Sequence, residues 1–206
     1  MKCPACGTDN SEDAQFCGNC GASTSVSEAK GTHSMVDRMI RVCRLDVHMF
    51  EEVEADTSAT RQALLVVALV ALATGIASLG TTGLSGLFAG AAIAIAGWAI
   101  WAWLLYFIGT KILPSHETHA DWGQLARTVG FAQSPGVFRV LGVVPVVGGI
   151  IFLVASVWML VAMVIAVRQA LDYTSTWRAI GVVLLSFIPY AALMSIAFAL
   201  LGVIGR

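Results

Sequence analysis

Charged residues are scarce in this chain, and most of them lie near its N-terminus. Asp, Glu, Lys and Arg make up 12% of the 206 residues, about half of the roughly 25% that is usual in soluble domains. Residues 1–61 hold six of the twelve basic and ten of the thirteen acidic side chains. Water is therefore not the main solvent of the remaining chain. This contrast predicts a polar N-terminal region followed by a membrane domain.

The opening residues do not predict a secretory leader, and the sequence shows no catalytic pattern. It opens with Met1 and a polar, Cys-rich stretch, which predicts an N-terminus that stays in the cytosol. No nucleophile elbow, phosphate-binding loop or carboxylate pair is present, and the long apolar runs hold no ionisable side chain of the kind that marks membrane pumps and enzymes. We therefore expect no enzymatic activity. Arg139 is the one candidate charge near the bilayer, and we expect it to reach the cytoplasmic surface.

Four of the five cysteines form two CxxC pairs that are ten residues apart, at Cys3, Cys6, Cys17 and Cys20. A glycine follows each pair, so the backbone can curl toward the sulfurs, and tetrahedral zinc takes all four thiolates. The pattern predicts a structural zinc ribbon over residues 1–22, with a metal contribution on the order of 10 kcal/mol to its folding. Two disulfides or a redox pair are the alternatives, and a cytosolic location disfavours disulfides.

The predicted ribbon has little positive charge. Residues 1–22 contain Lys2 as their one basic residue against three acidic residues, so we expect no nucleic-acid binding and favour contact with a protein partner. Residues 23–33 are small and polar without periodicity, which predicts a flexible linker.

Residues 34–58 predict an amphipathic juxtamembrane helix, because their apolar side chains recur at helical spacing. These side chains are Val36, Met39, Ile40, Cys43, Val47, Phe50 and Val53. Arg38, Arg41 and Arg44 suit a helix that rests on the inner membrane surface among anionic lipids. The alternative is that the apolar stripe packs against the membrane domain or a partner helix.

Residues 59–206 contain four long apolar runs, at 63–79, 84–110, 150–167 and 179–203, and a short one at 135–149. If the short run also crosses, the positive-inside rule is satisfied, because four bases then share the cytosolic side: Lys111, Arg127, Arg168 and Arg178. We therefore predict an all-α membrane protein in the plasma or inner membrane. It is a bundle of about five transmembrane helices, the third short, with the C-terminus outside. A re-entrant hairpin at 135–149 is the alternative.

Gly86 and Gly90 form a GxxxG motif in the second long run. Such spacing lets helix backbones approach closely. The close neighbour is either another helix of the same chain or a second copy in a homo-oligomer.

Four segments together resemble the Yip (Ypt-interacting protein) domain family: Glu51–Asp56, Gln62–Ala63, Trp122–Leu125 and Gly130–Gly136. The resemblance implies a five-span membrane protein with a cytosolic N-terminus and an outer or luminal C-terminus. Eukaryotic relatives bind Rab-type GTPases, but this chain lacks the acidic Asp-Leu-Tyr-Gly-Pro motif of that branch. The resemblance is therefore to a prokaryotic member, for which it implies a fold and a location and no activity.

These observations favour a non-catalytic membrane scaffold or adaptor. In this hypothesis the ribbon contacts a cytosolic partner and the helices associate with other membrane proteins. The alternative is a transporter or channel for a small neutral solute, with the broken segment around Pro145 lining a cavity. A metal or redox sensor that signals through the ribbon is a third hypothesis.

Overall fold

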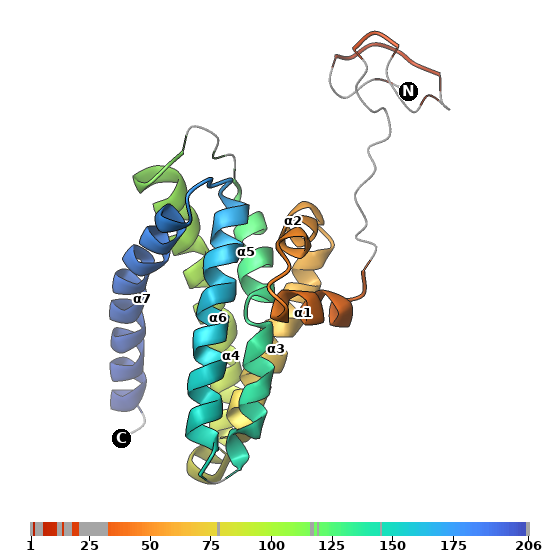
Figure 1. Ribbon diagram of the computed structural model, residues 1–206. Coiled ribbons are helices and arrows are strands. Elements are labelled where there is room, and N and C mark those ends of the chain that lie inside the picture. The colour runs from red at the N-terminus through yellow and green to blue at the C-terminus, as the bar shows by residue number, and fades with distance from the viewer. Residues whose placement is uncertain are drawn as a thin grey trace. The chain divides into compact units, whose positions relative to one another are not determined.

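The computed structural model describes residues 2, 6–11, 14, 18–20, 33–77, 79–115, 118, 120–144 and 146–204 (Figure 1). The chain divides into two compact units, Met1–Lys30 and Gly31–Arg206. In the first unit, Lys2 and Asp9 form an isolated antiparallel bridge. The described residues of the second unit form helices joined by short connections.

The stretch expected as one amphipathic helix is two helices, α1 (Met35–Cys43) and α2 (Val47–Ala55). The Ser34 hydroxyl caps α1 by accepting from the Asp37 amide, and the Asp46 carboxylate caps α2 by accepting from the His48 amide. Leu45, between the helices, has a φ of 59°. An aspartate such as Asp46, whose side chain accepts from the backbone amide two residues later, favours a new helix start over continuation.

The two helices pack against the membrane domain, which was one of the two alternatives. Val42, Met49, Phe50 and Val53 are buried, at 0–1% exposure, in the same core cluster as the long helices. Part of the predicted stripe turns outward, because Val36, Ile40 and Val47 are 58%, 46% and 41% exposed, whereas Met39 packs against the core.

Within the described residues, four helical stretches are long and apolar enough to cross a bilayer: Ala59–Ala77, Phe88–Ile112, Gly148–Ala170 and Thr176–Ala197. The corresponding elements are α3 (Ala59–Ala77), α4 (Leu79–Phe107) with the π-helical turn η1 (Ile108–Ile112), α6 (Gly148–Ala170) and α7 (Thr176–Ile204). Gly83 interrupts α4 with a φ of 66°. This break lies between the first two predicted apolar runs.

A shorter pass lies between η1 and α6. It consists of α5 (Trp122–Phe131) and the 3-10 helix η2 (Ser134–Val143). The contacts of three of its glycines with α3 show the direction in which this pass runs. A methyl group on Gly130, Gly136 or Gly142 would meet the side chain of Ala63, Val70 or Ala77, at 2.8, 2.6 and 3.3 Å respectively. Both series ascend in number, so this pass runs parallel to α3 along its apolar length.

The same short pass runs antiparallel to α6. Arg139 of η2 bonds to Ser156, and Phe138 stacks on Trp158, while Gly142 lies against Gly148 at the start of α6. A re-entrant hairpin would return to its starting end, whereas η2 continues to the far end of α3. The short third pass is confirmed. Because a 3-10 helix rises about 2 Å per residue, η2 covers more of the bilayer than an α-helix with the same number of residues.

The end of the bundle where α2 and α5 lie is called here the α2 end (Figure 1). Arg168, in the last turn of α6, and Arg178, in the first turn of α7, both lie there. Tyr173 donates to the carbonyls of Gly109 and Leu113, at 2.9 and 2.6 Å, which joins the loops after η1 and α6. Arg178 donates to the Pro114 carbonyl, and Arg168 to the Tyr173 carbonyl. The α3–α4 connection lies at the opposite end.

Candidate functional sites

Arg38 is the centre of a polar network at the α2 end. Its side chain is fully buried, and its Nη2 atom lies 2.5 Å from Asp56 Oδ2 and 3.1 Å from Glu52 Oε1. Its Nη1 atom donates to Gln62 Oε1 at 3.0 Å. Two carboxylates and an amide therefore compensate for the burial of one guanidinium, as a buried charge requires.

Asp56 also begins the first span. Its second oxygen, Oδ1, accepts from the Ser58 amide at 2.9 Å and the Ser58 hydroxyl at 2.6 Å. One carboxylate thus fixes the chain at the entry to α3 and neutralises Arg38 of α1.

A second arginine, Arg127 of α5, joins the network through backbone carbonyls. Its Nη2 and Nε atoms donate to the carbonyls of Glu54 and Val53, at 2.6 and 3.3 Å. Gln124, which closes a capping box with Asp121 at the start of α5, donates to Glu54 Oε1 at 3.1 Å. An arginine and a glutamine of α5 therefore both hold the last turn of α2.

The carboxyl group of Glu54 has a raised pKa. Burial raises its pKa from an ordinary value near 4.5 to about 7, and the charge of Asp172 adds to the increase while Arg127 opposes it. From α6, Gln169 donates to Glu51 Oε1 at 2.9 Å. Side chains of α1, α5 and α6 therefore bond to α2 or its C-cap, and α3 joins the network through Gln62, which accepts from Arg38. The network is called here the α2 anchor and consists of Arg38, Glu51, Glu52, Val53, Glu54, Asp56, Gln62, Gln124, Arg127 and Gln169.

The anchor corrects one expectation and explains one resemblance. Arg38 does not meet lipid headgroups, since it is 0% exposed, and Arg127 is also buried, at 6% exposure. Glu51–Asp56, Gln62 and Gln124 belong to the segments that resemble the Yip family, and the structure joins them in one network although they are up to 70 residues apart: Gln124 bonds Glu54 directly, and Gln62 is linked to Asp56 through Arg38.

The described part of the N-terminal unit fits a metal knuckle. Gly7, directly after Cys6, has a φ of 73°, a left-handed conformation that glycine adopts without strain. Asn19 reaches from the second CxxC turn to the first, with Nδ2 at 3.9 Å from Cys6 Sγ and 3.3 Å from Thr8 Oγ1. Gly18 donates to Asn10 Oδ1 at 3.0 Å.

These bonds hold residues 6–10 and 18–20 together, so Cys6 and Cys20 lie on adjoining turns. Cys3 and Cys17 lie outside the described residues. A four-thiolate set of this kind fits tetrahedral zinc, which would supply the cross-link that so small a unit lacks.

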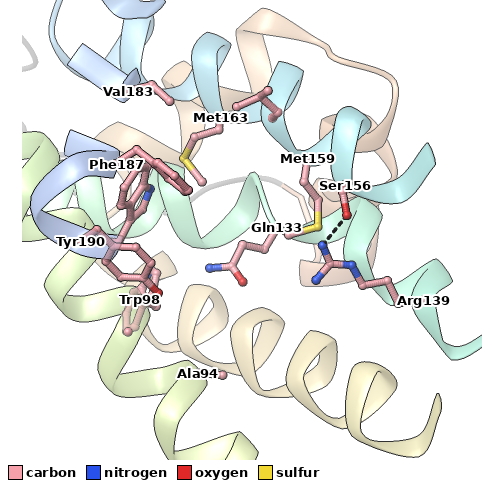
Figure 2. A pocket seen from close by; sticks show the side chains of 13 residues that line it. Ala94, Trp98, Gln133, Arg139, Ser156, Met159, Met163, Val183, Phe187 and Tyr190 are labelled. Atoms are coloured by element: carbon pink, nitrogen blue, oxygen red, sulfur yellow. Dashed lines mark hydrogen bonds between the residues drawn. The ribbon is translucent and has the colours of Figure 1, made fainter. Parts of the chain in front are cut away.

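An open cavity of about 440 Å³ lies between α4, η2, α6 and α7 (Figure 2). Its walls are mainly aromatic and apolar, and Gln133, Arg139, Ser156 and Tyr190 bring polar atoms to it. The lining residues are Ala94, Gly97, Trp98, Trp101, Gln133, Arg139, Ser156, Met159, Leu160, Met163, Val183, Phe187 and Tyr190. Sequence reasoning missed this site, because its residues come from four separated elements.

Arg139 does not extend to the α2 end, as its expected role required. Its Nη2 atom donates to Ser156 Oγ at 2.8 Å, and its guanidinium carbon lies 4.4 Å from the centroid of the Phe152 ring. Figure 2 shows the side chain held against α6, with the Gln133 amide between it and Tyr190. The charge therefore remains within the bundle.

Comparison with known families agrees with this architecture. The family model of the zinc-ribbon domain matches residues 2–24, and that of the Yip1 domain matches residues 47–197. Searches of curated proteins and of solved structures returned no match. The Yip1 match begins at the first residue of α2 and covers most of the α2 anchor, the short third pass and the cavity. The chain is thus a membrane protein of the Yip1 domain family that carries an N-terminal zinc-ribbon domain.

Proposed function

We propose that this protein is a non-catalytic membrane scaffold, in which the α1–α2 pair and the zinc ribbon present surfaces to protein partners. One observation carries the proposal: the α2 anchor fixes α1 and α2 to the bundle, yet α1 leaves Val36 and Ile40 exposed one turn apart. An apolar pair on a fixed support is suited to binding, because little conformational entropy is lost when a partner docks.

The proposed orientation places the α2 end in the cytoplasm and the C-terminus outside. The positive-inside rule supports it, because Lys111, Arg127, Arg168 and Arg178 lie at the α2 end. The connections at the opposite end, around Gly83 and Val144, carry no charged residue in the sequence. The orientation puts the ribbon and the exposed pair of α1 in the same compartment.

We further propose that Cys3, Cys6, Cys17 and Cys20 hold one structural zinc ion. The family match and the adjoining Cys6 and Cys20 turns support this assignment. A closed four-thiolate site has no open position for substrate, so the metal has a structural role.

The test is purification of crosslinked complexes from native membranes, with mass spectrometry of the proteins recovered. A V36D/I40D variant puts charges on the proposed contact surface and leaves the anchor intact, so we expect it to lose the partner. The matched control is V146D, because Val146 is 97% exposed at the opposite end of the bundle. A C6S/C20S variant tests the ribbon separately. Recovery of no protein by either unit of the wild type would contradict the scaffold function.

A second candidate, transport of a small neutral solute, is favoured by the cavity between α4, η2, α6 and α7. It predicts uptake by proteoliposomes that depends on the cavity lining. Negligible flux across a panel of neutral solutes would remove this candidate, without bearing on partner recovery.

A further inference from the structure

Arg139 lies within the apolar length of the bundle. Gly136 is level with Val70 and Gly142 with Ala77, so Arg139 lies between these levels, well inside the apolar length of α3. A guanidinium at such depth is costly unless it is paired, and in membrane proteins such residues mark functional sites.

Few partners among the described residues compensate for placing the Arg139 charge at this depth. Among the described residues, its one hydrogen bond is to a neutral hydroxyl, Ser156 Oγ, and its Nε atom is buried without a partner. No carboxylate of the described chain forms an ion pair with it, in contrast to Arg38, which has two. A guanidinium carries five N–H donors, so Arg139 retains donors for an acceptor that the described chain does not provide.

The cavity beside Arg139 is suited to hydrocarbon. Trp98, Met163 and Phe187 line its end toward α4 and α7, and Met159 lies next to Arg139, with the Gln133 amide between the two ends (Figure 2). The cavity volume of about 440 Å³ is in the range of small-molecule sites. One end thus offers a positive charge and the other an apolar wall.

We propose that this cavity binds an anionic membrane amphiphile. An oxygen of its phosphate or carboxylate accepts from Arg139, with the Gln133 amide as a second polar contact. Its hydrocarbon chain lies along Trp98, Met163 and Phe187. The source of the ligand is the bilayer, because the site lies at bilayer depth and its walls are mainly apolar. The inference does not depend on the scaffold function.

The experiment measures lipid binding to the purified full-length chain in detergent by native mass spectrometry. The probes are phosphatidylglycerol, phosphatidylcholine with the same chains, and oleate. We expect 1:1 binding of at least one of the two anionic probes, and weaker binding of the zwitterionic lipid. R139Q should weaken anionic binding about tenfold, as expected for loss of a charge-assisted hydrogen bond. R178Q is the matched control, because Arg178 bonds the Pro114 carbonyl outside the cavity.

A second variant keeps the test decisive if R139Q does not fold. A94F leaves Arg139 in place and fills the cavity from α4, so it should reduce binding of the same amphiphile. The proposal is overturned if phosphatidylcholine binds as tightly as both anionic probes, or if folded R139Q and A94F bind like the wild type. Displacement by an equal concentration of inorganic phosphate would instead identify a soluble-anion site, and would also overturn it.

Discussion

Arg38 and Arg41 are three residues apart on α1, yet their environments differ completely. Arg38 is enclosed and bonded to Asp56 and Glu52, whereas Arg41 is 39% exposed and contacts Asp37 and Asp46 near the surface. Removing one partner of a buried ion pair destabilises a protein far more than removing one partner of an exposed pair. The remaining buried charge has lost its hydration and has no partner to replace it. The two arginines therefore form a natural matched pair for mutation.

We predict that Arg38→Ala lowers the free energy of unfolding by about 3–5 kcal/mol, because Asp56 is left buried without its cation. Arg41→Ala should change it by less than about 1 kcal/mol. Unfolding of the detergent-solubilised protein, followed by circular dichroism, measures both. Equal effects of the two substitutions would show that burial of Arg38 does not matter energetically.

The raised pKa of Glu54, about 7, predicts a pH dependence. The folded state binds this proton more tightly than the unfolded state, whose carboxyl has a pKa near 4.5. Stability therefore falls as pH rises between these two values, and levels off above the higher one. Glu54→Gln keeps an acceptor for Gln124 without the titration. The variant should be more stable than the wild type in alkaline buffer, and the difference should shrink as the pH is lowered in unfolding experiments across this range.

Residue environments were the least predictable part of the sequence. Arg38, Arg41 and Arg44 recur at the same spacing on one amphipathic pattern, and nothing local distinguishes them. The partners of Arg38, Asp56 and Gln62, are 18 and 24 residues away. Arg139 was noticed as unusual, but the cavity beside it depends on α4 and α7, which no local pattern connects to η2.

At the scale of elements, the short third pass depends on close contact between η2 and its neighbours. A methyl group on Gly136 would lie 2.6 Å from Val70 Cγ1 and 2.9 Å from Met159 Sδ, so α3 and α6 both approach this one residue. Glycine at this position lets η2 lie between two long helices.

We predict that Gly136→Ala destabilises the bundle by about 1–3 kcal/mol through overpacking. Gly149→Ala is the control, because among the described residues no atom outside its chain neighbours and the adjacent helix backbone lies within 4 Å of the position that its methyl group would take. That substitution should be neutral or stabilise α6 by up to about 1 kcal/mol. Thermal unfolding of the two variants in the same detergent compares them, and a neutral Gly136→Ala would argue against tight packing of η2.

The sequence predicted the long spans well, since an uncharged apolar run of bilayer length has few alternatives. It also predicted the third pass from charge placement alone. It did not predict the break at Leu45, because the apolar periodicity continues through the turn while the cap at Asp46 restarts the helix.

At the scale of the whole molecule, the chain is two compact units, Met1–Lys30 and Gly31–Arg206. Hydrophobic burial supports the second, and the proposed zinc supports the first. Loss of the metal should therefore affect one unit alone.

We predict that a strong chelator releases one zinc per chain and exposes four thiols to alkylation, while the unfolding temperature of the bundle is unchanged. Cys43 is the internal control. Burial raises the pKa of its thiol to about 11, so it should remain unmodified in mildly alkaline buffer while the protein is folded. Quantified metal release with mass spectrometry of alkylated peptides reports both effects. Release of no zinc, or a parallel loss of bundle stability, would contradict the prediction.

The short third pass also bears on the kind of membrane that this protein prefers. Its 3-10 part, η2, spans Ser134–Val143. At the 3-10 rise such a segment reaches roughly 20 Å, whereas the hydrocarbon core of a bilayer is about 30 Å thick. Phe138, Leu141 and Val143 of η2 are exposed on this short face. Lipids beside η2 meet an apolar face shorter than the hydrocarbon core, and mismatch of this kind sorts proteins among bilayers of different thickness. We expect the protein to concentrate where the membrane is already thin.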